Sequence, residues 1–386
     1  MEKIKLGEIC DIVSGSTPKT NVDEYWDGNI DWITPAEISD STFIVKESIR
    51  KITELAVLES GLKSFPKGTV ILSSRAPIGK VAIAGKELYC NQGFKNLICS
   101  DKIYNYYLYW FLKGKSEYLN SLGRGATFKE ISKSIVENIE IMLPPYEEQR
   151  ERSEKIEKCW RIVNLRNGQL NYLDELIKSR FVEMFGDPVS NTKGWKTELV
   201  GNICFVTKLA GFEYTNYIHY QDQGDVIMIR GLNVKNQHLK LDDVYWINEA
   251  VSNMLPRSQL KENDVVMTYI GVNIGDVALV DGNNRYHLAP NVAKISPISF
   301  DELNPVFFVN LLAFNKQNFA SNATNTAKQA LNMEKIRKLK VMLPPVELQE
   351  QFAVFVQQVD KLKVEVQKSL DETQLLMDSL MQKYFG

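Results

Sequence analysis

The sequence has little of what supports metal binding, disulfide bonding or membrane insertion. Its 386 residues include only three histidines and five cysteines, and the cysteines are scattered without CxxC spacing. This pattern argues against both a zinc site and a disulfide framework. No stretch approaches the roughly 18 consecutive apolar residues of a membrane-spanning helix. We therefore expect reduced, mostly buried thiols, no bound metal, no membrane contact and a cytoplasmic location.

An excess of charge of either sign is also missing. Lys and Arg total 46 and Asp and Glu total 48, so the formal net charge is −2. This balance excludes a polybasic protein that binds nucleic acid through its bulk charge. It leaves room for a local basic face, which is enough for nucleic-acid binding.

Motifs of common enzymes are absent as well. The chain contains neither a GxxxxGK[ST] phosphate-binding loop nor an HExxH metal motif. Leu143-Pro144-Pro145-Tyr146 invites comparison with the (Asp/Asn/Ser)-Pro-Pro-Tyr loop of amino methyltransferases, but a leucine side chain cannot accept the hydrogen bond that this loop supplies. We expect no catalytic residue and no cofactor bound by this chain. The three histidines are expected at the surface or in loops.

What the chain does contain is an internal repeat, with matching blocks about 200 residues apart. Four separated blocks recur in the same order, which makes a chance match improbable. The blocks are Leu6–Cys10 with Val200–Cys204, Val70–Ile71 with Val266–Met267, Leu143–Gln149 with Leu343–Gln349, and Met184–Gly186 with Tyr384–Gly386. Two copies at this spacing predict two similar domains rather than a solenoid.

Each half begins with short β-branched runs and turns and ends with a long helical pattern. The runs predict strands at Val70–Ser73, Val81–Ala84, Val265–Thr268 and Val277–Val280, with helices at Ile103–Leu112 and Val306–Ala313. The fold class is therefore α/β (α+β), duplicated, with a pseudo-twofold. The predicted parts are an α/β domain at 1–145, a helix at 146–186, a linker at 187–196, a second α/β domain at 197–345 and a second helix at 346–386.

The two long helical segments carry an apolar stripe at 3-4 spacing, which is typical of a coiled-coil seam. A rod of about forty residues spans roughly 60 Å and needs a partner along its length. The obvious partner is the other copy, packed antiparallel, and Lys363 at a seam position could set the register. The predicted packing residues are Ile156, Val163, Leu170, Leu173, Ile177, Val356, Val359, Val366, Leu370, Met377 and Leu380.

Polar loops in both domains carry residue types that suit nucleic acid. Arg reads guanine edges, Asn and Gln suit adenine, and Ser, Thr and Lys hold phosphates. The alternative is that each loop is an ordinary solvated turn, but corresponding loops are polar in both halves and differ in identity, which favours binding. The candidate DNA-binding residues are Ser16, Thr17, Lys19, Ser73, Ser74, Arg75, Lys80, Arg124, Thr127, Lys129, Tyr269, Asn273, Thr326, Lys328 and Gln329.

On these motifs the sequence resembles the specificity subunit of a type I restriction–modification system. The resemblance rests on the paired Leu-Pro-Pro-x-Glu-x-Gln helix openings, each followed by a long helix that ends in Phe-Gly. The duplicated domain starts and the loop Ser73–Val81 add to it. The second half departs from the pattern, since Tyr269–Asp276 has no counterpart of Arg75 or Lys80.

The resemblance implies a prokaryotic, non-catalytic subunit whose two target domains each read one half of a bipartite double-stranded DNA site. The helices would fix the spacer and dock two methyltransferase (M) subunits, which supply S-adenosylmethionine and methylate adenine N6. Restriction (R) subunits would join for cleavage, with ATP and Mg in the full complex.

Three other interpretations stay open on the sequence alone. One is the recognition subunit of a related system whose partner fuses methylation and cleavage. Another is a coiled-coil assembly scaffold that does not bind DNA, and the third is a methyltransferase that acts alone.

Overall fold

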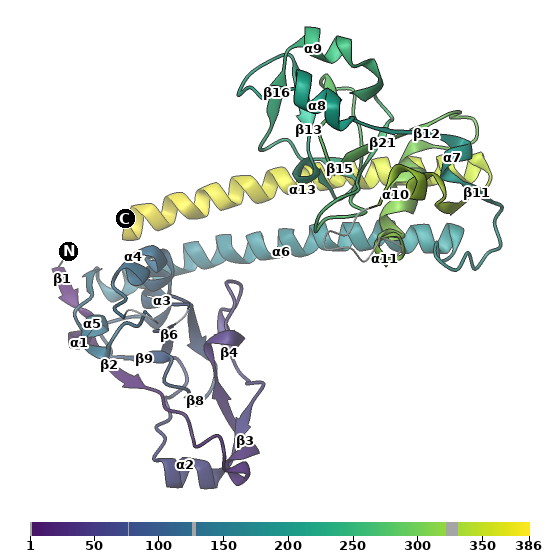
Figure 1. The fold of residues 1–386 in the computed structure, drawn as a ribbon. Coiled ribbons are helices and arrows are strands. Elements are labelled where there is room, and N and C mark those ends of the chain that lie inside the picture. The colour runs from purple at the N-terminus through teal and green to yellow at the C-terminus, as the bar shows by residue number, and fades with distance from the viewer. Residues whose placement is uncertain (1, 76, 126–128, 322–330) are drawn as a thin grey trace. The chain divides into compact units, whose positions relative to one another are not determined.

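The structure is a computed structural model that describes residues 2–75, 77–125, 129–321 and 331–386. The chain forms two compact units, one of Met1–Gln169 with Val366–Gly386 and the other of Leu170–Glu365 (Figure 1). Each unit contains one α/β domain, the first part of one long helix and the last part of the other. The division between the units therefore falls inside the long helices.

The first unit is built on a 5-stranded sheet with the order β2-β9-β6-β7-β4. Helix α3 packs on β6 and β7, and its buried face includes Tyr107 and Trp110. A 3-stranded sheet, β5-β3-β8, lies beside it with helix α2. The bounds are β2 Cys10–Ser14, β3 Trp26–Ile33, β4 Ile44–Val45, β5 Lys51–Ile52, α2 Glu54–Ser60, β6 Val70–Ser73, β7 Val81–Ala84, β8 Tyr89–Cys90, β9 Phe94–Cys99 and α3 Asn105–Gly114.

Shorter elements complete this unit. Strand β1 pairs antiparallel with β10, which brings the chain start next to the strand that precedes the first long helix. These elements are β1 Glu2–Lys5, α1 Leu6–Ile9, the 3-10 turns η1 Asp23–Tyr25 and η2 Pro35–Glu37, α4 Ser116–Ser121, α5 Lys133–Glu137 and β10 Glu140–Leu143. The predicted strands at Val70–Ser73 and Val81–Ala84 are confirmed, and the predicted helix begins at Asn105 rather than Ile103.

The second unit repeats this plan with a 4-stranded sheet, β12-β21-β18-β19, which is covered by α10. Its second sheet has the order β16-β13-β20-β17. The bounds are β11 Thr197–Leu199, α7 Val200–Ile203, β12 Cys204–Lys208, α8 Gly211–Tyr217, β13 Val226–Ile229, η3 Gly231–Asn233, β14 Val234–Lys235, β15 His238–Leu239, β16 Tyr245–Ile247, α9 Glu249–Met254, η4 Pro256–Ser258, β17 Gln259–Leu260, β18 Val265–Thr268, β19 Val277–Leu279, β20 Tyr286–Leu288, β21 Val292–Pro297, α10 Pro305–Phe314, α11 Lys316–Ser321, α12 Met333–Arg337 and β22 Lys340–Met342.

Strand register corrects one part of the sequence alignment between the halves. Strand β2 begins at Cys10, which pairs with Cys99, and β12 begins at Cys204, which pairs with Pro297. Leu97 and Ile295 each lie two residues before these partners, so the two residues are equivalent. Val70 pairs with Leu97, and Val265 pairs with Ile295. The counterpart of Val70 is therefore Val265 and not Val266, since the loop after β18 is one residue longer than the loop after β6.

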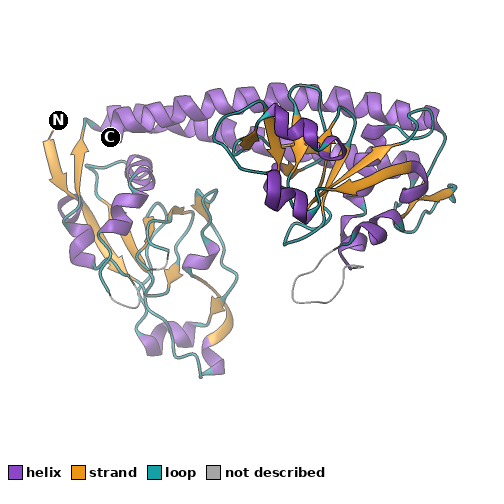
Figure 2. Cartoon of the chain, turned by 45° about the horizontal axis from the view of Figure 1, so that its top comes forward, coloured by secondary structure: helices purple, strands orange, loops and turns teal. Residues whose placement is uncertain are grey.

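The two long helices are α6, Tyr146–Phe185, and α13, Val346–Phe385. In the first unit the start of α6 and the end of α13 share one hydrophobic cluster, which contains Ile156 and Phe385. In the second unit the end of α6 and the start of α13 share another, which contains Phe185 and Val356. The helices are thus antiparallel within each unit, as predicted, and within each unit the strands of the α/β domain lie beside the helix segments (Figure 2).

The apolar stripe does more than join the two helices. Ile156, Ile177, Val356 and Val359 lie in the same clusters as residues of the α/β domains, so the stripe also covers the domain cores. Of the predicted packing residues, the buried ones are Ile156, Ile177, Val356, Val359, Val366 and Leu370, and the half-buried ones are Val163, Leu170, Leu173, Met377 and Leu380. The stripe predicted as a coiled-coil seam is therefore shared, because residues of each α/β domain pack on the same face.

Lys363 makes the contact expected of a register-setting charge. Its Nζ lies 2.6 Å from Asp174 Oδ1 on α6 and 3.4 Å from Asp360 Oδ1 on its own helix. Any axial shift between the helices would separate Lys363 from Asp174. The ion pair therefore favours one register of α13 against α6 in the second unit.

The repeated Leu-Pro-Pro-x-Glu-x-Gln motif has a structural explanation in its glutamine. Gln149 is 1% exposed; its Oε1 accepts the Tyr104 N–H at 2.8 Å and its Nε2 donates to the carbonyl oxygens of Lys102 and Pro144 at 3.0 and 2.9 Å. Gln349 is 0% exposed and makes the matching bonds to Asn304, Glu302 and Pro344 at 2.9, 3.0 and 2.8 Å. Each glutamine thus joins a long helix to the chain that leads into α3 or α10.

Replacing Gln349 with Leu keeps the size of the side chain but leaves three backbone groups without their partner. Because unpaired buried polar groups are costly, we expect the free energy of unfolding to fall by about 2–3 kcal/mol. Denaturant unfolding of the full chain measures this loss. Gln358→Leu, at an exposed position of the same helix, serves as the control and should change the free energy by less than about 0.5 kcal/mol. Equal effects of the two substitutions would contradict the assignment.

Candidate nucleic-acid interface

Three of the loops singled out in the sequence meet at one end of the first unit's main sheet. Strand β2 ends at Ser14, which pairs with Lys95, and β6 ends at Ser73, which pairs with Phe94. The loops that follow β2 and β6 therefore lie beside the loop that enters β9. The segment around Glu130 joins them, since the Ile131 N–H donates to the Ser74 carbonyl oxygen at 3.1 Å.

The loop after β2 is held by two tryptophans. The Trp32 indole N–H donates to the carbonyl oxygen of Ser16 at 3.0 Å, and the Trp26 indole N–H donates to that of Lys19 at 3.3 Å. Thr17 Oγ1 donates to Gln92 Oε1 from the loop between β8 and β9. The side chains of Ser16 and Lys19 are exposed, so they face solvent from a fixed backbone.

Gly15 allows this loop to approach its neighbour closely. A Cβ atom at this position would lie 2.2 Å from the carbonyl oxygen of Asn91 and 2.4 Å from that of Cys90. The backbone N–H of Ser16 donates to the Cys90 carbonyl oxygen at 3.0 Å. A side chain at residue 15 would push the two loops apart, so glycine is required here.

The hydroxyl groups of Ser73 and Ser74 are not available to a ligand. Both residues are 0% exposed. Ser73 Oγ donates to the Pro77 carbonyl oxygen at 2.7 Å and accepts the Lys80 N–H at 2.9 Å, and Ser74 Oγ accepts from Lys95 Nζ at 3.3 Å. These two serines shape the loop, and we remove them from the set of candidate DNA contacts.

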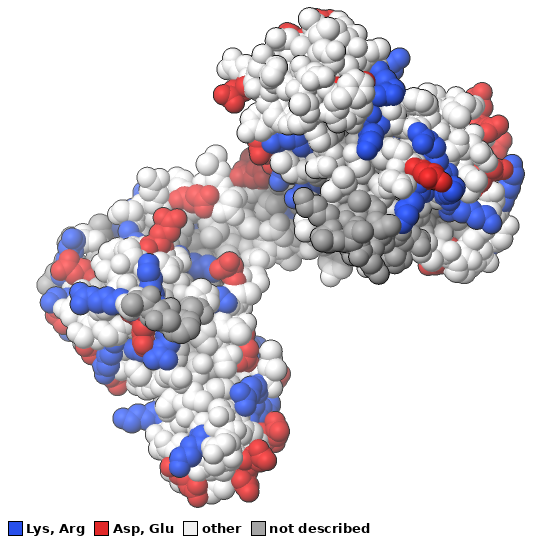
Figure 3. Space-filling model, in the orientation of Figure 1, with Lys and Arg blue, Asp and Glu red and all other residues white. Residues whose placement is uncertain are grey.

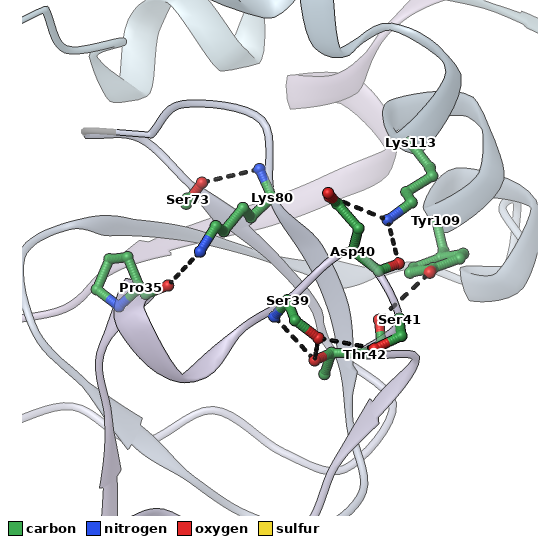
Figure 4. A network of polar contacts seen from close by, with 9 residues as sticks. All are labelled: Pro35, Ser39, Asp40, Ser41, Thr42, Ser73, Lys80, Tyr109 and Lys113. Carbon is green, nitrogen blue, oxygen red and sulfur yellow. Dashed lines mark hydrogen bonds and ion pairs between the residues drawn. The ribbon is translucent and has the colours of Figure 1, made fainter. Parts of the chain in front are cut away.

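Lys80 reaches away from the serines towards the neighbouring sheet. Its Nζ donates to the carbonyl oxygen of Pro35 at 3.1 Å, while its backbone N–H is bonded to Ser73 (Figure 4). The side chain is half-buried. Lys80 therefore ties the loop after β6 to the turn η2.

Arg75 and Arg124 approach the same acidic residue from two loops. Arg75 Nη2 lies 2.9 Å from Glu130 Oε2, and the backbones of Arg124 and Glu130 exchange hydrogen bonds of 3.0 and 2.9 Å. Lys129 is exposed beside them. Thr127 lies outside the described residues. Arg75, Arg124 and Lys129 thus lie in neighbouring loops of the first unit, and their part in DNA binding stays a prediction.

Lys95 and Glu130 are the residues of this cluster that sequence reasoning missed. Lys95 is 6% exposed, and its Nζ lies 3.3 Å from Glu130 Oε1. Burial disfavours ionisation of Glu130, but hydrogen bonds from Arg75 and Lys95 outweigh it and hold the pKa of this carboxyl below its usual value. Lys95 and Asn96 interrupt the apolar residues of the strand Phe94–Cys99, and that interruption was the available signal.

An open hollow of about 820 Å³ lies beside this cluster. Its lining includes Lys95, Arg124 and Glu130 together with Ser132 and Lys133. Basic and acidic side chains are interspersed on the face shown in Figure 3, in keeping with the nearly neutral net charge. The charged side chains that line the hollow therefore include both basic residues and the acidic residue Glu130.

The second unit places its own candidates on the same backbone frame. Tyr269 is 7% exposed, and Lys208 Nζ lies 5.4 Å from the centroid of its ring. Asn273 is half-buried in the loop after β18. Thr326, Lys328 and Gln329 lie outside the described residues.

Four backbone hydrogen bonds show that the two frames match. Each bond in the first unit has an equivalent in the second with a length within 0.3 Å. The pairs are Ser73 N to Lys80 O (2.8 Å) with Thr268 N to Asp276 O (2.8 Å), Gly79 N to Ser73 O (3.1 Å) with Gly275 N to Thr268 O (2.9 Å), Ser74 N to Gly93 O (2.7 Å) with Tyr269 N to Asn291 O (3.0 Å), and Ile131 N to Ser74 O (3.1 Å) with Leu331 N to Tyr269 O (2.9 Å).

The side chains on the matching frames differ. Ile270 takes the place of Arg75, Ala293 that of Lys95, and Asp276 that of Lys80. Asp276 Oδ1 pairs with Lys316 Nζ at 2.5 Å. The two units therefore present different chemistry from one scaffold.

The described histidines and cysteines do not form a reactive centre. His287, expected at the surface, is 0% exposed on β20, and burial lowers its pKa. Burial raises the pKa of the Cys90 and Cys204 thiols to about 12, so both are protonated at neutral pH. Among the described residues, no group of three or more His, Cys, Asp or Glu side chains is placed to hold a metal ion. No helix in that part of the chain is long and apolar enough to cross a membrane.

Solved structures share this fold. A type I restriction–modification system S subunit from M. genitalium superposes with a TM-score of 0.61 at 15% identity, covering 100% of this chain and 96% of that one. A chain from a structure that addresses complex assembly and conformational transition of the type I R-M system gives a TM-score of 0.58 at 17% identity. It covers 100% of this chain and 97% of its own length.

Curated relatives and a family model agree with the fold. The MjaIX specificity subunit of a type I restriction enzyme from Methanocaldococcus jannaschii is 28% identical over 98% of this chain and 91% of its own length. The EcoBI specificity subunit from Escherichia coli is 21% identical over 74% of this chain and 66% of its own length. The model of the type I restriction modification DNA specificity domain matches residues 1–175 and again 193–373. The chain therefore belongs to the type I restriction–modification specificity family and carries two copies of its domain.

Proposed function

We propose that this chain is the DNA-recognition subunit of a type I restriction–modification complex, and that each target domain reads one half of a bipartite double-stranded site. The observation that carries the proposal is the pair of matching loop frames with different side chains. A shared frame gives both domains the same approach to a duplex. Different side chains on that frame give them different half-sites.

Two domains on one chain discriminate the target DNA sequence from other sequences better than one domain does. Each wrong base pair costs about 1–3 kcal/mol, roughly additively for separated positions. A single small domain covers few base pairs, whereas two domains combine their penalties. The helices α6 and α13 connect the two units through continuous backbone, and in this proposal they set the length of the spacer.

Catalysis in this proposal belongs to partner subunits, and this chain is non-catalytic. Two methyltransferase subunits dock on the helices and target domains and use S-adenosylmethionine to methylate adenine N6. Restriction subunits join for cleavage with ATP and Mg. The complex works in the cytoplasm of a prokaryote.

Adenine methylation in the source organism tests the proposal directly. Long-read mapping with the gene intact and deleted should show the loss of one bipartite motif on deletion, because no other subunit would direct the methyltransferase to that motif. The lost motif identifies both half-sites and the spacer. Complementation with the gene on a plasmid should restore methylation of that motif. An unchanged methylome, with the partner genes shown to be expressed, would overturn the proposal.

A further inference from the structure

The charged cluster in the first unit consists of Arg75, Lys95 and Glu130. Its arrangement suits hydrogen bonding to base edges better than binding to phosphates. Glu130 uses both carboxylate oxygens, Oε2 for Arg75 at 2.9 Å and Oε1 for Lys95 at 3.3 Å. The carboxylate between the two cations lowers the net charge of the group to +1 and so weakens its attraction for the phosphate backbone. The same carboxylate is a suitable partner for the amino group of cytosine, and a guanidinium is a suitable partner for guanine.

Glu130 is also anchored through the backbone. Its backbone exchanges two hydrogen bonds with Arg124, and the next residue, Ile131, bonds to Ser74. Lys95 is 6% exposed and also donates to Ser74, so the buried end of the cluster is fixed. The Arg75 side chain is 45% exposed. A fixed carboxylate thus holds a partly exposed guanidinium, which is the arrangement of a pre-positioned donor.

Arg75 and Lys95 have no charged counterparts among the described residues of the second unit. The positions of Arg75 and Lys95 are occupied by Ile270 and Ala293 in the second unit, on the matching frame. If Arg75 and Lys95 only held the loop in shape, the second unit would need them as well, yet it builds the matching loop with Ile270 and Ala293 at these positions. The difference points to a role in selecting the first unit's half-site.

We propose that Glu130 is a positioning residue that holds Arg75 against a base edge of the half-site read by the first target domain. The proposal rests on the function proposed above and adds a specificity-determining pair to it. Arg75 uses one of its five N–H donors on Glu130 and presents the guanidinium to the duplex. Glu130 acts through Arg75, so its effect requires Arg75 to be present.

The test uses the full chain in complex with its methyltransferase subunits and the duplex identified by methylation mapping. Binding is measured to the target, to a scrambled duplex and to single base-pair substitutions across both half-sites, at several salt concentrations. The variants are Arg75→Ala, Glu130→Gln and the double variant. Glu140→Gln is the control, because this carboxylate in the same unit is 50% exposed and pairs with Lys3.

For Glu130→Gln we expect relaxed discrimination at one or two positions of one half-site. In the wild type, a wrong base at such a position should weaken binding by about 5- to 150-fold. In the variant, the same wrong base should weaken binding by less than about threefold. The other half-site and the slope of affinity against salt should stay as in the wild type, because a base contact releases no counterions. In the Arg75→Ala background, Glu130→Gln should have no further effect.

Other results overturn the proposal in distinguishable ways. A uniform loss of affinity with a salt slope reduced by about one would show that Arg75 binds a phosphate. Additive effects of the two substitutions, or an unchanged profile for Glu130→Gln, would reject the positioning role while leaving the proposed function in place. A wild-type complex that does not discriminate the target from scrambled DNA would reject both.

Discussion

Replacing Phe185 with Ala should destabilise the second target domain by about 3–5 kcal/mol, although this residue belongs to the first half of the sequence. Phe185 is 0% exposed, and its ring lies 4.8 Å from that of Phe307 on α10 and 5.6 Å from that of Phe352 on α13. Phe385 has the reciprocal role in the first unit, with its ring 5.0 Å from that of Tyr107 on α3. Each helix end therefore completes the core of the domain that the other half encodes.

Hydrogen exchange of the full chain, followed peptide by peptide, measures this effect where it occurs. Phe185→Ala should reduce protection in residues 197–345, and Phe385→Ala should reduce it in residues 1–145. Phe385 is 8% exposed at the end of its helix, so its loss should be the smaller of the two. Tyr172→Ala and Leu375→Ala, at positions 78% and 72% exposed, are the matched controls on the same helices. Protection lost only in the domain of the same half would contradict the reciprocal packing.

The long helices and the repeat could be predicted because their signals are local. Pro144 and Pro145 mark the entrance of α6, and an apolar residue every three or four positions identifies a buried face. The residues that cover that face could not be predicted from these local signals. Phe185 and Phe307 are far apart in sequence, and a period of 3.6 residues indicates a buried face without saying what covers it. The role of the Phe-Gly helix ends therefore became visible only in the packed structure.

The candidate interface shows the same division between local and non-local information. Loop composition identified Arg75 and Arg124, because exposed loop cations are apparent from sequence. Ser73 and Ser74 were misassigned, since a serine in a tight loop is polar by composition but can be buried by its own hydrogen bonds. Glu130 was missed because its importance lies in its pairing with Arg75 and Lys95, which are distant in sequence.

The helices also permit a prediction about the DNA site as a whole. Inserting seven residues into α6 between Gln169 and Leu170, and seven into α13 between Glu365 and Val366, adds length where the two compact units divide. A heptad keeps the apolar stripe in phase in a coiled coil. Each insertion extends its helix by about 10.5 Å, which corresponds to at most about three base pairs at 3.4 Å each. We expect methylation of the original motif to be lost and a motif with the same half-sites and a longer spacer to be gained.

Methylation mapping of a strain that carries only the double-insertion gene provides the measurement. A heptad in α6 alone is the first control. It should abolish methylation, because α6 and α13 would then connect the two units with unequal lengths and could not keep the packed faces of both units aligned. A four-residue insertion in both helices is the second, since it rotates the apolar stripe by about 40° and should reduce methylation at any spacing. The half-sites themselves must stay the same in the heptad variant, because the loop frames of both domains are untouched. An unchanged spacer in an active variant would show that the spacer is set by the partner subunits instead of by the helices of this chain.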